Sequence, residues 1–339
     1  MKKRRLELYK EYPEPGEEEL TDRLAVLMQK LVAKEYLTGT TPRATHAKGL
    51  VAARGEFTVE PGLPEELRVG LFREPRTYPC WMRFANLSPK PQADIKPDIR
   101  AVSFKLMGVE GRREWQDDEE ARTLDFIMMG SKTFLAPDLP QFYDMEAAID
   151  RGTAHVVWFM LTHPAIGYTI ATSSRKCANV LEVPYWSQTA YAFGERAVQY
   201  HLKPRRPATS RLPKHPADNF LRERLVEDLA AGEAHFDFFV QFQTDPWKMP
   251  IEKPIIPWDE KLSPYRKVAS VRIDRQRCDT PARNSFCENI SFNAWRTLPE
   301  HRPLGGINRA RKTVYQALSQ FRHRRNSAPP REPRPDEVY

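Results

Sequence analysis

The chain has 339 residues, of which 40% are hydrophobic and 29% charged, and its net charge is +8. This length and composition allow one large domain with a substantial core, or two smaller ones. No apolar run is long enough to cross a bilayer, which excludes a protein built on membrane-spanning helices. The basic residues 1–5 are not followed by the apolar stretch of a signal peptide, so we expect a cytoplasmic protein.

The cysteines and the basic chain ends are weak guides to function. Cys80, Cys177, Cys278 and Cys287 are widely spaced and form no CxxC pair, which is typical of reduced thiols. Basic residues gather at both ends of the chain, where they could contact nucleic acid or anionic lipid. Solvated tails are the simpler explanation, and we expect no nucleic-acid partner.

The first half of the chain predicts a helix, a strand-rich region and a second helix. Apolar residues at near-helical spacing indicate a helix over residues 17–37. Residues 41–135 are strand-rich, with Pro and Gly between the runs. A helix is expected over residues 139–158, and the apolar patch at residues 156–161 is interpreted as part of a buried helix.

The second half alternates strands with helices. Apolar and polar residues roughly alternate in three predicted strands, over residues 191–202, 235–244 and 267–274. Two helices are predicted over residues 218–231 and 308–322, and the Pro-rich residues 246–264 are expected to wind over the surface. Antiparallel strands with segregated helices favour an α+β fold.

Three segments follow from this pattern. Residues 1–40 form an N-terminal basic arm and helix, and residues 41–325 form the main domain. Residues 326–339 form a Pro/Arg-rich tail, for which we expect disorder.

Tyr315 is a candidate iron ligand. A phenol with a pKa of about 10 is a poor ligand when neutral, so it needs a nearby cation as well as the metal. Arg311 lies four residues earlier, on the same face of the predicted helix, and its planar guanidinium can donate to the phenolate oxygen. Arg322, about two turns further on, could meet an anionic group. A half-buried core tyrosine is the alternative interpretation.

His46 is a candidate acid/base. Residues 45–59 alternate well enough to predict a strand that contains this histidine. An imidazole can take a proton from a peroxide and return it to the leaving oxygen, because its pKa lies near neutrality. A core or surface histidine is the alternative, and the 8 His include no HExxH zinc motif.

Several short blocks, taken together and in order, resemble the haem catalases. The matching blocks are residues 43–49, 55–57, 81–84, 98–105, 126–134, 187–203 and 311–322. Their order and spacing agree with the family from about residue 40 to residue 325, so the chain resembles a short catalase-related protein. The resemblance implies an antiparallel eight-stranded β-barrel with surrounding helices, and makes residues 41–325 a catalase-like haem domain.

The resemblance also implies roles for individual residues. His46, preceded by Thr45, would be the distal acid/base, and Tyr315 would be the proximal ligand of a haem b iron, a role tyrosine has in catalases. Arg311 would support the tyrosinate. Arg43, Arg83 and Arg322 match arginines that bind haem propionates in the family, although a surface charge is the ordinary role of an arginine.

Three departures from the family affect the expected activity. Catalases carry an asparagine that orients peroxide, but no Asn occurs from Arg122 to Asp138, so Arg122 or Thr123 would have to donate that hydrogen bond. Ala85 stands where the family usually has Ser. Thr45 resembles the allene oxide synthases, which have Thr in place of the catalase Val. Met128 and Met129 are compatible with an apolar distal pocket.

Three functions compete. The first is a haem-dependent peroxidase or catalase-like oxidoreductase that reduces hydrogen peroxide or organic hydroperoxides; the sequence does not identify a reductant. The second is an allene oxide synthase-like fatty-acid hydroperoxide isomerase or lyase, for which a lipid hydroperoxide is the substrate. The third is a barrel without haem that binds an acidic partner through its basic ends. Homo-oligomerisation is left open.

Overall fold

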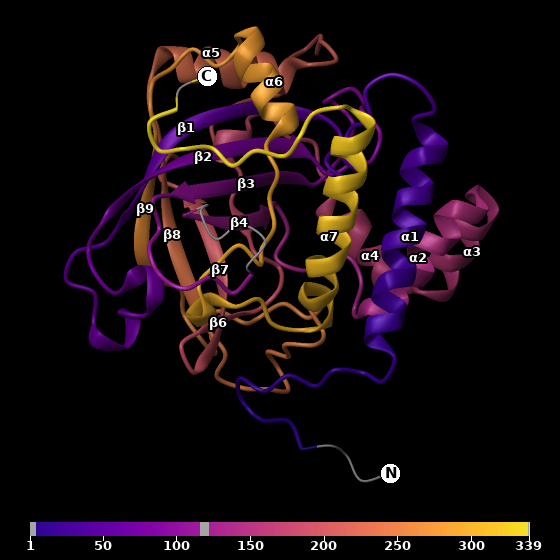
Figure 1. The fold of residues 1–339 in the computed structure, drawn as a ribbon, viewed down its shortest axis with the longest axis horizontal. Coiled ribbons are helices and arrows are strands. Elements are labelled where there is room, and N and C mark those ends of the chain that lie inside the picture. The colour runs from indigo at the N-terminus through magenta and orange to yellow at the C-terminus, as the bar shows by residue number, and fades with distance from the viewer. Residues whose placement is uncertain (1–4, 116–121, 338) are drawn as a thin grey trace.

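A closed antiparallel barrel forms the centre of the protein (Figure 1). The structure is a computed structural model, and it describes residues 5–115, 122–337 and 339. The strands are β1 (Gly49–Val59), β2 (Thr77–Asn86), β3 (Arg100–Met107), β4 (Thr123–Met129), β5 (Tyr185–Trp186), β6 (Tyr191–Phe193), β7 (Arg196–Pro204), β8 (Ala234–Phe242) and β9 (Arg266–Ile273). Eight of them close a ring in the order β1-β2-β3-β4-β5-β7-β8-β9, and β6 pairs with β7 beside the ring. The α+β class and the eight-stranded barrel are therefore confirmed.

Alternation along the strands fills the barrel with aromatic side chains. In β4, Phe126 and Met128 point into the core, whereas Ile127 and Met129 line a cavity outside it. Phe126 packs against Phe57, Phe104 and Phe238 with ring centroids 4.9–5.9 Å apart. The interior is thus a packed core, and any large ligand must bind on the outer face of the barrel.

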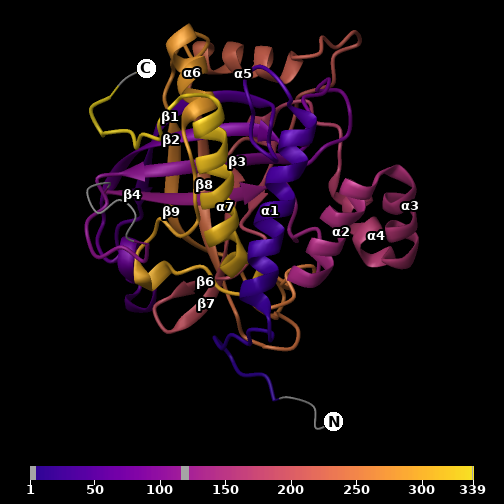
Figure 2. The same ribbon diagram turned by 45° about the vertical axis from the view of Figure 1, so that its right-hand side comes forward.

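Seven helices in the described part of the chain surround the barrel or pack on the helices that do. They are α1 (Glu17–Glu35), α2 (Leu139–Arg151), α3 (Thr153–Thr162), α4 (Pro164–Ser173), α5 (Phe220–Ala231), α6 (Pro281–Asn289) and α7 (Gly306–Arg325). Helices α1 and α7 run side by side along the barrel, and α5 and α6 pack near β1 (Figures 1 and 2). Helix α2 packs on α1, and α3 and α4 project beyond it (Figure 2). None of the described helices combines the length and apolarity needed to cross a membrane.

The structure corrects three expectations about secondary structure. Strand β1 begins at Gly49, so His46 is not in the strand but three residues before it, with a φ of 61°. The helix expected over residues 139–158 breaks at Gly152, whose φ of 107° is accessible mainly to glycine. Helix α3 begins immediately after this glycine. The strand predicted over residues 191–202 is in fact the hairpin of β6 and β7, because the chain turns at Gly194, which has a φ of 63°. The remaining predicted helices and strands are confirmed within a few residues, whereas α4 and α6 were not predicted.

The segment after α7, which composition suggested to be disordered, contacts the barrel through charged and aromatic side chains. The buried Lys105 forms ion pairs with Glu332 and with Asp125. Its Nζ lies 2.6 Å from Glu332 Oε2 and 2.6 Å from Asp125 Oδ1. The Tyr339 ring stacks on Phe286 with centroids 3.9 Å apart. The charge of Lys105 is therefore balanced partly by the tail.

Candidate functional site

His46 faces a cavity with its imidazole held between two side chains. Its Nδ1 lies 3.1 Å from Thr45 Oγ1, and its Nε2 lies 3.3 Å from Met129 Sδ. Its backbone carbonyl accepts a hydrogen bond from Arg83 Nη2 at 3.1 Å. Burial, and then the positive charges of nearby arginines, lower the pKa of His46 to about 3. The imidazole is therefore neutral at neutral pH and can accept a proton.

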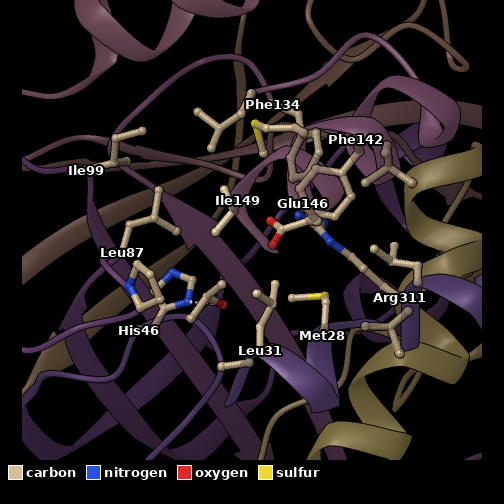
Figure 3. A pocket seen from close by; sticks show the side chains of 18 of the residues that line it. Met28, Leu31, His46, Leu87, Ile99, Phe134, Phe142, Glu146, Ile149 and Arg311 are labelled. Carbon is tan, nitrogen blue, oxygen red and sulfur yellow. Dashed lines mark hydrogen bonds between the residues drawn. The ribbon is translucent and has the colours of Figure 1, made fainter. Parts of the chain in front are cut away.

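The cavity next to His46 is large and mostly apolar. It has a volume of about 360 Å³, and its walls come from α1, α2, α3, α4, α7 and β4. Figure 3 shows Met28, Leu31, Phe134 and Phe142 among the side chains that surround it. A cavity of this size and polarity suits a ligand with a substantial hydrocarbon part.

Three arginines gather at a second cavity, which adjoins the first. This cavity, of about 110 Å³, is lined by Arg43, Arg83 and Arg322, and it shares His46 and Tyr315 with the larger one. Burial, and then the charges of Arg83 and Arg322, lower the pKa of Arg43 well below its usual value. The structure thus brings together the three arginines that the sequence singled out.

Backbone carbonyls at the end of α6 accept hydrogen bonds from these guanidinium groups. The last carbonyls of a helix have no partner within it and carry a partial negative charge. Arg83 Nε donates to the Cys287 carbonyl at 3.1 Å, and Arg322 Nη1 donates to the Glu288 carbonyl at 2.7 Å. The Glu288 carboxylate lies 3.7 Å from Arg43. Three cations facing one carboxylate leave an excess of positive charge at this cavity, which suits an anionic ligand.

Tyr315 lies where the cavities meet. It is half-buried on α7 and lines both cavities described above. It also lines a third cavity, which has a volume of about 410 Å³. Arg311 lies one turn earlier and also lines the large cavity. Its Nη1 donates to Thr189 Oγ1 at 3.2 Å and to Asn308 Oδ1 at 3.0 Å. The hydrogen bond from Arg311 to the Tyr315 oxygen stays a prediction.

The distal side of the cavity differs from what the sequence suggested. Thr123 Oγ1 donates to Glu332 Oε2 at 3.2 Å, and Arg122 is exposed, so neither residue lines the His46 cavities. Met129 instead presents its sulfur to the imidazole. The expectation that Arg122 or Thr123 replaces the missing amide is therefore wrong, because the Thr123 hydroxyl binds Glu332 and the exposed Arg122 precedes β4.

Glu146 is a cavity residue that the sequence analysis missed. It lies on α2, and Figure 3 shows its carboxyl group directed into the large cavity. Burial raises its pKa to about 7. The signal was present in the sequence, because Leu139, Phe142, Glu146 and Ile149 recur at helical spacing and place an acid on an apolar face.

Replacing Glu146 with Gln should stabilise the protein at pH 8 but not at pH 4.5. The folded-state pKa of about 7 exceeds the ordinary value of 4.5, so stability is lost as pH rises between these values. Since each unit of pKa shift corresponds to about 1.4 kcal/mol, the gain at pH 8 should be up to roughly 3 kcal/mol. Denaturant unfolding at both pH values measures the difference.

The matched control is Glu35→Gln. Glu35 lines the same cavity but is partly exposed and pairs with Lys90 at 2.6 Å, so its replacement should give no such gain at pH 8. An equal effect of Glu146→Gln at both pH values would contradict the raised pKa.

The fold is that of the catalases. Its solved neighbours include a fungal catalase, with a TM-score of 0.66 and 18% identity over 86% of this chain and 61% of that one. A bacterial catalase is similar with a TM-score of 0.68 and 17% identity over 88% of this chain and 60% of that one. Catalase A from Saccharomyces cerevisiae is also similar, with a TM-score of 0.67 and 19% identity over 94% of this chain and 68% of that one. The chain spans about three fifths of the length of the first two. No family model and no curated protein matches the sequence.

Proposed function

We propose that this protein is a haem-dependent peroxidase that reduces hydrogen peroxide or organic hydroperoxides. One observation carries the proposal: His46, Tyr315 and the arginine cluster border two adjoining cavities on the outer wall of a catalase-type barrel. A neutral base, a phenol and a cationic pocket are the groups that such chemistry needs around one cofactor.

The cavity residues fit haem b. The macrocycle is flat and apolar with two carboxylates at one edge, and the cavities offer an apolar space joined to the cluster of Arg43, Arg83 and Arg322. Tyr315 would ligate the iron. The described residues hold no group of three or more His, Cys, Asp or Glu suited to a metal ion, and a single phenolate ligand requires a macrocycle to supply most of the others. When bound, haem supplies the redox chemistry that breaks a peroxide O–O bond.

The chain's own residues would handle the proton and the water. His46 is neutral, so its imidazole would accept the peroxide proton and return it to the leaving oxygen. Thr45 Oγ1, 3.1 Å from Nδ1, would fix the ring orientation. Apolar walls would exclude water from the base and strengthen its electrostatic interactions.

A fatty-acid hydroperoxide isomerase or lyase is the second candidate. It is favoured by Met129, whose sulfur faces Nε2, and by the apolar character of the large cavity. Such an enzyme would break the O–O bond of a lipid hydroperoxide without an external reductant. Thr45 agrees with this alternative as well.

Product analysis separates the two candidates. The hemin-supplemented protein would be given hydrogen peroxide, cumene hydroperoxide or linoleic acid hydroperoxide, each with and without an electron donor. We expect turnover that requires the donor and yields water or the corresponding alcohol. Donor-independent rearrangement of the lipid hydroperoxide would establish the isomerase or lyase instead. A protein that takes up no hemin would overturn both and favour a barrel without haem.

A further inference from the structure

Helices α3 and α4 present an apolar surface to solvent. The side chains of Val157, Trp158, Leu161 and Tyr168 are 55%, 68%, 71% and 72% exposed. We call these four residues the outer face. The patch at residues 156–161 was expected to be buried, but α3 packs mainly on α2 and α4, and Figure 2 shows the pair projecting from the body of the protein. Large apolar groups exposed together mark an interaction surface.

The opposite side of the same two helices forms a wall of the large cavity. Val156 and Met160 of α3 and Ile170 of α4 line that cavity together with His46 and Glu146. A layer one helix thick therefore separates the outer face from the cavity. A molecule held at the outer face would lie next to the cavity wall.

The charges around the outer face match an anionic partner. From residue 151 to residue 181 the sequence contains no Asp or Glu. Arg151, Arg175 and Lys176 are exposed at the ends of the α3–α4 pair. Trp and Tyr side chains favour the boundary between lipid tails and headgroups, and cations beside such a face attract anionic headgroups.

The lengths of the helices define how such a surface would meet a bilayer. Each of α3 and α4 has 10 residues, which corresponds to about 15 Å at 1.5 Å per residue. The hydrocarbon core is about 30 Å thick, so neither helix can cross it. They would lie in the interface plane, with the outer face toward the lipid tails.

We propose that the outer face of α3 and α4 docks this protein on the surface of an anionic lipid bilayer. A second copy of the chain is a poorer occupant, because two-fold contact through this face would bring the cations of both copies together. The proposal does not depend on the peroxidase activity. If both hold, the wall of the His46 cavity would lie next to the acyl chains of the bilayer.

Co-sedimentation with vesicles tests the proposal. We expect the full-length protein to bind vesicles of phosphatidylcholine and phosphatidylglycerol at 3:1 more tightly than vesicles of phosphatidylcholine alone. The double variant W158S/L161S should lose affinity at least about tenfold, since it removes the two largest apolar contacts of α3. The control is Trp247→Ser, because Trp247 is 56% exposed but lies in the loop after β8.

A charge variant provides a second, independent readout. R151E/K176E keeps the outer face intact and should abolish the preference for anionic vesicles. Circular dichroism would confirm that each variant remains folded. Absence of vesicle binding by the parent protein, or equal binding by W158S/L161S, would overturn the proposal. Concentration-dependent self-association that W158S/L161S removes would assign the face to a second copy instead.

Discussion

The Tyr315→Phe variant should lose the visible haem absorption that we expect of the hemin-supplemented parent protein. Phenylalanine keeps the packing of Tyr315 against the apolar side chains of α1 and α7 but has no oxygen to ligate iron. The parent should give a high-spin ferric spectrum, because an anionic oxygen ligand stabilises ferric iron. Titration with hemin, followed by absorption, gives the stoichiometry and the affinity of both proteins.

Tyr36→Phe is the matched control for this experiment. Tyr36 lines the same large cavity, and its hydroxyl donates to the Pro89 carbonyl at 2.9 Å. Its removal should leave the spectrum unchanged. A Tyr315→Phe protein with the parent spectrum would refute the assignment of the ligand, while a parent protein that binds no hemin would refute the haem proposal as a whole.

Replacing His46 with Asn should reduce peroxide turnover by about 10²–10⁴-fold, the usual contribution of a positioned acid/base. Asparagine tolerates the left-handed backbone conformation of this position, so the change removes the imidazole with little added strain. The haem spectrum should persist, since Tyr315 and the arginine cluster are untouched. Steady-state rates at equal haem content measure the effect.

The pH dependence of the parent enzyme checks the same assignment. With a pKa of about 3, His46 stays neutral between pH 5 and pH 8, so it should cause no fall in rate over this range. Thr45→Val removes only the hydroxyl beside Nδ1 and should have a smaller effect than His46→Asn. A His46→Asn enzyme with the parent rate would exclude the histidine as the acid/base.

The sequence could predict the site residues that follow from local periodicity. Tyr315 and Arg311 are four residues apart in a helix, so their common face was predictable before α7 was known. The two-residue strand β5 was not, because Tyr185 and Trp186 carry no periodicity. Closure of the ring through β5 depends on its pairing with β7 and with β4, and β4 is distant in the sequence.

Long-range packing also explains what the sequence analysis missed around the cavity. Met128 and Met129 are both apolar, and only the position of β4 in the barrel sends one to the core and the other to His46. The apolar patch at residues 156–161 predicts a helix, but the sequence does not show whether other elements cover that helix. In the fold α3 packs mainly on α2 and α4, so part of the patch stays exposed. Helical spacing implied the position of Glu146, while its raised pKa comes from burial in the folded protein.

The hydrogen bonds between the arginine cluster and the end of α6 have a consequence for the order of assembly. Three guanidinium groups without counter-ions would repel one another and resist burial, yet here the carbonyl oxygens of residues 287–290 hold them in place. The polypeptide can therefore complete its fold while the neighbouring cavity still lacks an anion. A prosthetic group arriving later would meet a rigid, positively charged receptor, and its uptake would be fast at low ionic strength and slower as salt screens the attraction.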